Sequence, residues 1–205
     1  MTHRTKLPSW QFAQRRVTLR RLSGVEQIGP LTWCHWLNDP EVRQHLESKG
    51  DWTPERLREW FADNNNGSLC RVYAISVNYR VTTIEVGTLK LDGVRRGGWP
   101  SVGLMIGDKS VWGKGVGTEA ITKACRIAHR AGCWGGWAGI RVDNIGSRRA
   151  FNRAGFRQVG LVNSSGRKFW RSDCIFPEEC PEMVAATGTW SPKPDRMVVM
   201  RRLPL

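Results

Sequence analysis

The sequence predicts an α/β fold in which a central mixed sheet is covered by helices on both faces. Segments in which every second residue is apolar are typical of strands, and segments with apolar residues three or four positions apart are typical of helices. The two kinds of segment are interspersed along 205 residues, which is enough chain for one domain with a substantial core.

Seven segments are expected to be strands. They cover residues 17–21, 69–77, 81–91, 101–106, 137–142, 156–162 and 197–200. The turns Asn78-Tyr79-Arg80 and Asp92-Gly93 end the second and third of these strands. Within the third strand the apolar positions change phase at Gly87-Thr88, which predicts a β-bulge.

The expected helices cover residues 30–37, 54–63, 120–131 and 144–154, and a further short helix starts at Pro40. Thr53 is the predicted N-cap of the second helix, and Pro54 takes its first helical position. Gly132 is predicted to end the helix at 120–131 as its C′ glycine. The basic segment 1–15 is expected to be a flexible leader to a single domain of residues 16–205, with a loop insertion at about 172–195.

A glycine-rich turn joins the strand at 101–106 to the helix at 120–131. We call residues 112–118, Trp-Gly-Lys-Gly-Val-Gly-Thr, the glycine turn. Its three glycines lie at every second position, so the backbone can approach a bound group closely. Free N–H groups at the start of a helix, together with the positive end of the helix dipole, favour an anion. The glycine turn therefore predicts a phosphate or pyrophosphate site.

Two common phosphate-binding motifs fit this turn poorly. A P-loop requires four residues between its first glycine and the Gly-Lys pair, but five separate Gly107 from Gly113, and Gly115 replaces the hydroxyl residue after Lys114. A dinucleotide fingerprint matches residues 115–120, but its first glycine should lie at the end of the strand. The P-loop is excluded, and the dinucleotide site is the weaker alternative.

Three segments together resemble the GCN5-related N-acetyltransferase (GNAT) superfamily. They are residues 102–120 and, downstream, Asn144-Ile145-Gly146-Ser147 and Ala154-Gly155-Phe156. The resemblance covers about residues 16–165 and implies a mostly antiparallel sheet of about seven strands. In that family the glycine turn holds the pyrophosphate of acetyl-CoA, the co-substrate. Trp112 replaces the usual Arg or Gln of the family motif, a departure shared by the RimJ/RimL type branch, which segment 36–42 also resembles.

The resemblance implies a set of acetyl-CoA-binding residues. Backbone groups of the strand before the turn would bind pantetheine and polarise the thioester carbonyl, Asn144 would hold pantetheine or cap its helix, and arginines would bind the 3′-phosphate. The predicted residues are Leu104, Met105, Ile106, Trp112, Gly113, Lys114, Gly115, Val116, Gly117, Thr118, Asn144, Arg149, Phe151 and Arg153. Arg148 is a further alternative for the 3′-phosphate.

The proton-transfer groups are predicted separately. Many GNAT proteins have a tyrosine as the acid for the thiolate, but Phe151 stands at that position. In the RimJ/RimL type branch a serine can take the role, so Ser147 is the predicted general acid, with helix capping as the alternative. Glu85, which points away from Ile84 and Val86, is the predicted base, acting through water. The remaining base alternatives are a water chain to solvent or one of Asp39, Glu41, His45 and Asp173.

Composition narrows the function classes. The net charge of +14 suits an anionic co-substrate, and also allows contact with the ribosome or a nucleic acid. Six cysteines without a C-x-x-C pair predict no metal and a reducing, cytoplasmic environment. No run of 18 apolar residues occurs, so we expect no membrane span.

The sequence therefore predicts an N-acetyltransferase, a monomer or a homodimer. It would move an acetyl group from acetyl-CoA to a primary amine, of a protein N-terminus or an amino sugar, by direct attack in a ternary complex. Two alternatives remain open. One is a non-catalytic, regulatory acyl-CoA-binding domain, suggested by Phe151, and the other is a basic nucleic-acid-binding module.

Overall fold

The computed structural model describes residues 16–46, 50–65, 69–79, 82–162, 168–170 and 197–202. The predicted leader, the predicted insertion and Asp173 lie outside these residues. The described strands form one eight-stranded sheet in the order β1-β2-β3-β4-β5-β8-β6-β7. Their bounds are β1 Arg16–Arg21, β2 Cys70–Tyr79, β3 Thr82–Asp92, β4 Ser101–Ile106, β5 Gly136–Ile140, β6 Arg157–Val162, β7 Lys168–Trp170 and β8 Met197–Arg202.

The sheet is mixed and mostly antiparallel, as expected. Every neighbouring pair of described strands is antiparallel except β4 and β5, which run parallel. The predicted number of strands was about seven, and the eighth is the three-residue strand β7. A segment this short shows too little alternation to be recognised in a sequence.

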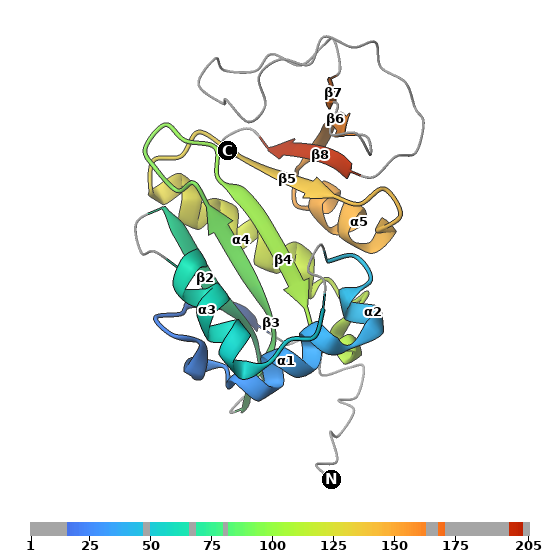
Figure 1. Cartoon of the computed structure of the whole chain (residues 1–205). Helices are drawn as coiled ribbons and strands as arrows, with labels where there is room; N and C mark the ends of the chain where they lie inside the picture. The colour runs from blue at the N-terminus through green and yellow to red at the C-terminus, as the bar shows by residue number, and fades with distance from the viewer. Residues whose placement is uncertain are drawn as a thin grey trace.

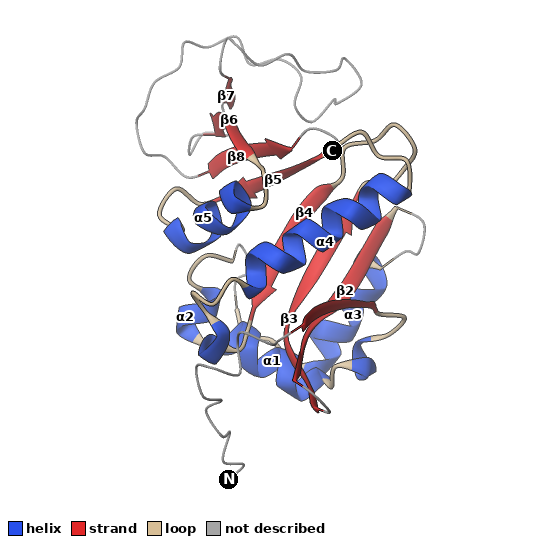
Figure 2. Ribbon diagram, turned by 180° about the vertical axis from the view of Figure 1, so that it is seen from behind, coloured by secondary structure: helices blue, strands red, loops and turns tan. Residues whose placement is uncertain are grey.

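In the described part of the chain, five α-helices cover the two faces of the sheet (Figures 1 and 2). Their bounds are α1 Pro30–Asn38, α2 Pro40–Arg43, α3 Pro54–Asn64, α4 Val116–Arg130 and α5 Ile145–Arg153. Helices α1 to α3 lie on one face and α4 and α5 on the other, so each face has its own apolar core. On β2, Tyr73 and Ile75 face α4 while Val72 and Ala74 face the α1–α3 side, because side chains alternate along a strand. No helix in the described part of the chain is long and apolar enough to cross a membrane.

The predicted caps and the bulge are present, with small shifts. The Thr53 hydroxyl accepts a hydrogen bond from the Arg56 amide at 3.3 Å, so it caps α3. The bulge lies one residue earlier than predicted. Ile75 pairs with Gly87 and Ser76 pairs with Glu85, so Val86 of β3 has no partner on β2.

The predicted turn at residues 78–80 begins too early. Asn78 and Tyr79 still belong to β2, where they pair with Thr83 and Thr82 of β3. The apolar alternation stops before the hairpin does, because its end extends beyond the core and both threonines are exposed. A polar hairpin end therefore resembles a turn in the sequence.

The end of β4 packs directly against α1. A Cβ atom on Gly107, the residue after β4, would lie 2.1 Å from two ring carbons of Trp36, which is only 1% exposed. The Trp36 ring has no room to move aside, since it is enclosed in the core of the α1–α3 face. Gly107 thus sets how closely α1 approaches the strand that precedes the glycine turn.

We expect Gly107→Ala to lower the free energy of unfolding by about 1–3 kcal/mol, the usual cost of overpacking a filled core. Denaturant unfolding followed by tryptophan fluorescence measures this change. Gly24→Ala is the matched control, because nothing lies within 4 Å of its added Cβ; it should change stability by no more than about 0.5 kcal/mol. Equal effects of the two variants would show that the Trp36 contact does not limit this position.

Candidate active site

Strands β4 and β5 pair at one end and then separate (Figure 1). Their one registered pair is Ser101 with Trp137, whose amide donates to Pro100 O at 3.1 Å. On its other side β4 stays paired with β3 as far as Ile106. The separation leaves the later residues of β4 without a strand partner on the β5 side in the described chain.

The backbone of β4 can therefore bind an extended molecule. Gly107 N donates to Val86 O at 2.9 Å, so the alternation of the antiparallel ladder directs the N–H and C=O groups of Leu104 and Ile106 toward β5. Met105 bonds to β3 instead, and its side chain packs into the core of the α1–α3 face. Of the three predicted residues on this strand, two present backbone groups to the opening.

The glycine turn lies at the N-terminus of a helix, as predicted, but α4 begins at Val116, inside the turn and four residues earlier than expected. Gly113 and Gly115 have φ angles of 71° and 81°, a left-handed conformation that glycine adopts without strain. Gly117 serves packing instead, because an added Cβ would lie 3.3 Å from a methyl group of Leu104 on β4.

Several amides of the glycine turn are available to an anion. The first amides of a helix have no acceptor inside the helix. Those with no acceptor among the described residues are the N–H groups of Gly113, Gly115, Val116, Gly117 and Thr118. Together with the helix dipole, these donors are arranged as a phosphate group would require.

Trp112 fastens the glycine turn to β4. Its indole N–H donates to Ile106 O at 2.9 Å, while the side chain stays 40% exposed. The residue that replaces the usual Arg or Gln therefore closes the loop between strand and turn. Its sequence position predicted a binding residue, but not this hydrogen bond.

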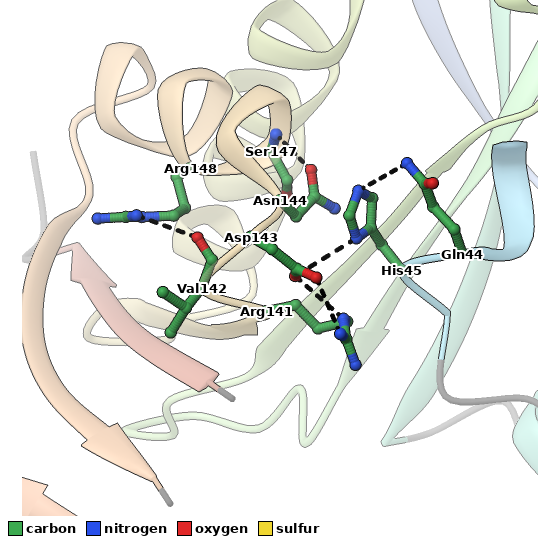
Figure 3. Close-up of polar contacts among 8 residues, drawn as sticks. All are labelled: Gln44, His45, Arg141, Val142, Asp143, Asn144, Ser147 and Arg148. Atoms are coloured by element: carbon green, nitrogen blue, oxygen red, sulfur yellow. Dashed lines mark hydrogen bonds and ion pairs between the residues drawn. The ribbon is translucent and has the colours of Figure 1, made fainter. Parts of the chain in front are cut away.

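At the start of α5, Asn144 caps the helix and Ser147 does not (Figure 3). Asn144 Oδ1 accepts a hydrogen bond from the Ser147 amide at 3.0 Å, so Asn144 is the helix cap. The Ser147 hydroxyl is half-buried and makes no hydrogen bond to any described residue. The capping alternative thus applies to Asn144, and the Ser147 hydroxyl is free to act on a substrate.

The other predicted residues of α5 differ in position. Arg149 and Arg153 are exposed and make no ion pair with the described residues, whereas Arg148 donates to Val142 O at 3.1 Å. Phe151 is only 2% exposed and packs edge-on against Phe156, with the ring centroids 5.0 Å apart. Its ring therefore belongs to the core, and its predicted contact with the co-substrate stays a prediction.

The predicted base, Glu85, lies away from the separation of β4 and β5. Its carboxylate forms an ion pair with Arg20 of β1, so the side chain reaches across β2 toward the far edge of the sheet. Arg20 also donates to Gln27 O at 3.1 Å, which places the pair on the α1–α3 face. The role of Glu85 stays a prediction that these contacts do not favour.

Two other carboxylates are held by Lys109, in the loop between β4 and the glycine turn. Its ammonium lies 2.8 Å from Asp39 Oδ2 and also contacts Glu41. Asp39 caps α2 as well, accepting from the Glu41 amide at 2.9 Å. The hydrogen bond from Lys109 lowers the pKa of Asp39, and the two carboxylates raise that of Lys109. These contacts tie α2 to the approach of the glycine turn.

A further acidic group, Asp143, contacts a histidine in the loop just before α5 (Figure 3). His45, just after α2, has Nδ1 3.6 Å from Asp143 Oδ1 in the β5–α5 loop. Arg141 holds Asp143 with two hydrogen bonds, Nε to Oδ1 at 3.1 Å and Nη2 to Oδ2 at 2.9 Å. These hydrogen bonds, and then the charges of Arg141 and His45, hold the pKa of Asp143 below its usual value despite some desolvation. Asp143 was not among the predicted catalytic residues, and no motif marks it.

Comparisons with known proteins agree with this geometry. The model of the Acetyltransferase (GNAT) domain family matches residues 16–157. No curated protein matches the chain. Spermidine N-acetyltransferase from Vibrio cholerae, solved with CoA and spermine, has a similar structure, with a TM-score of 0.65 at 13% identity over 91% of this chain and 95% of that one.

Two further solved structures show the same fold. An acetyltransferase (GNAT family) from Bacillus anthracis has a TM-score of 0.62 at 15% identity, over 92% of this chain and 95% of that one. A domain from Methanocaldococcus jannaschii has a TM-score of 0.63 at 18% identity, over 76% of this chain and 96% of that one. The family match covers well over half of the sequence. The chain belongs to the GNAT family and is an acyltransferase, an N-acetyltransferase that uses acetyl-CoA.

Proposed function

We propose that this enzyme acetylates a primary amine, of a protein N-terminus or an amino sugar, by direct attack in a ternary complex, as in the RimJ/RimL type branch. One observation carries the proposal. The unpaired edge of β4, the free amides of the glycine turn and the Ser147 hydroxyl lie along one path from the separated strands to the starts of α4 and α5.

Acetyl-CoA would bind along this path. The free amides of Gly113, Gly115 and the first turn of α4 suit its pyrophosphate, and Lys114 adds positive charge. The pantetheine amides would pair with Leu104 and Ile106 in the way of an added strand. The exposed Arg149 and Arg153 suit the 3′-phosphate.

Ser147 is the proposed acid for the departing thiolate. Its hydroxyl can donate, since no described residue takes its proton and Asn144 already serves as the helix cap. A backbone N–H on β4 would polarise the thioester carbonyl, as donors placed at a developing oxyanion do.

The charges around the site favour an acceptor with a single amine. Every carboxylate in segments 39–45 and 141–147 already contacts a cation, Lys109 or Arg141. A polycation such as spermine, bound by the Vibrio cholerae enzyme, would find no free acidic group in those segments and would be repelled by a chain of net charge +14. Contact of this basic chain with the ribosome or a nucleic acid stays a prediction.

We expect Gly115→Ala to weaken acetyl-CoA binding roughly tenfold, a loss of about 1.4 kcal/mol. A Cβ at this left-handed residue costs roughly 1–2 kcal/mol, and relaxing the strain turns amides away from the pyrophosphate. Gly93→Ala is the matched control, because Gly93 has a φ of 84° and directly follows β3, outside the glycine turn. Isothermal titration should show normal binding by Gly93→Ala; equal weakening in both variants would refute the proposed pyrophosphate site.

Ser147→Ala should lower kcat about 100-fold, since the thiolate then leaves without a proton donor. The dissociation constant of acetyl-CoA should stay within about twofold of the wild-type value, because this hydroxyl acts in the transition state. Release of CoA thiol with an amine panel measures kcat, and Ser23→Ala, at an exposed serine outside the site, is the control. Full activity of Ser147→Ala would exclude the acid role.

A further inference from the structure

The contact between His45 and Asp143 joins the segment after α2 to the loop before α5. His45 follows α2, on the face of the sheet that carries α1 to α3, and Asp143 lies one residue before the cap of α5. The His45 side chain is 22% exposed, and its Nδ1 is buried without a hydrogen bond to the described residues. Asp143 Oδ1, 3.6 Å away, is just beyond hydrogen-bond distance. Such contacts often tighten when substrate binds.

The neighbours of the ring define its tautomer. Gln44 Nε2 lies 3.0 Å from His45 Nε2, and an amide nitrogen can only donate. With the Gln44 amide in this orientation, Nε2 of His45 is assigned as the acceptor and the ring proton is assigned to Nδ1, facing the carboxylate. The exposed Gln44 amide marks the position that an N–H group of an acceptor would take.

Two charged groups lie near the ring, and only one of them faces it. Asp143 is ionised and is held in place by the two-point contact of Arg141. Arg43, two residues before His45, is directed to Asp51 at 3.7 Å and to Gly50 O at 3.0 Å. The Asp143 carboxylate thus faces Nδ1 and can orient the ring, as in other histidine bases that a carboxylate positions.

We propose that His45 is the general base of acetyl transfer and that Asp143, held by Arg141, is its positioning residue. The inference rests on the proposed function. It is favoured over Glu85 because Glu85 is paired with Arg20 toward the far edge of the sheet, whereas His45 contacts Asp143, in the loop that leads to the Asn144 cap and to Ser147 in the first turn of α5 (Figure 3).

The protons balance in the proposed step. His45 Nε2 removes one proton from the acceptor ammonium, directly or through one water molecule, and leaves a neutral amine. The amine forms the C–N bond on the thioester carbonyl carbon, and the C–S bond breaks. Ser147 gives its proton to the thiolate and regains one from the acylated nitrogen. The products are the amide, the thiol of CoA and one proton, which the imidazolium releases to water.

His45→Gln tests the base. We expect kcat/KM with an accepted amine to fall about 100-fold or more, and the remaining rate to rise with pH without a plateau, because hydroxide replaces the base. Binding of acetyl-CoA should be unchanged. His129→Gln, at an exposed histidine in the last turn of α4, is the matched control and should keep the wild-type profile. Added imidazole should partly restore His45→Ala but not Ser147→Ala.

Asp143→Asn tests the positioning role. Without the carboxylate the His45 Nδ1–H loses the group that orients the ring, so kcat/KM should fall about tenfold while acetyl-CoA binding stays unchanged. Asp143→Glu should recover most of the loss; a plain structural role would lower the melting temperature and weaken acetyl-CoA binding to the same extent.

The outcomes separate the two proposals. Suppose that the wild type acetylates an amine and that His45→Gln keeps kcat/KM within about threefold of the wild-type value at each pH. This loss would be well short of the usual contribution of a general base, so the role of His45 would be refuted while the proposed function would stand. A wild type that binds acetyl-CoA but acetylates no amine in a broad panel would overturn both.

Discussion

The separation of β4 from β5 is the constraint on which the rest of the site depends. A strand edge buried without partners is costly, because each unpaired N–H or C=O group loses its hydrogen bond to water. Here the two strands share one registered pair and then diverge, which leaves the backbone groups of Leu104 and the N–H of Ile106 for a ligand, while Ile106 O accepts from Trp112. The starts of α4 and α5 follow these two strands along the chain, so helix amides and side chains collect beside the opening.

Contacts between distant segments hold this opening in shape. Trp112 ties the glycine turn to Ile106 O, and Lys109 joins the same loop to the carboxylates of α2. Gly107 allows α1 to pack against the end of β4 through the Trp36 ring. Exposed ion pairs are individually weak, so the buried packing of Trp36 is the firmer of these restraints. Together they hold α1 and α2 against the end of β4 and the loop that leads to the glycine turn.

Charge pairing explains how a strongly basic chain can hold a site with several acidic groups. Asp39, Glu41 and Asp143 each contact a lysine or an arginine. The excess of positive charge then remains for an anionic co-substrate, which it would attract over a distance of about one Debye length. The same pairing keeps Asp143 ionised beside His45.

Local sequence determined most of the fold and the anion site, whereas tertiary structure decided the roles of individual side chains. Strand alternation, helix caps and the spacing of Gly113 and Gly115 act over a few residues, so they can be recognised without the fold. The bulge was predicted within one residue, because a change of phase is also a local signal. Partners from distant segments, such as Arg20 for Glu85 or Asp143 for His45, leave no such pattern. These partners meet because the strand order of the sheet and the docking of α2 bring their segments together. Strand order and docking depend on the packing of the whole chain, so no local segment can reveal them.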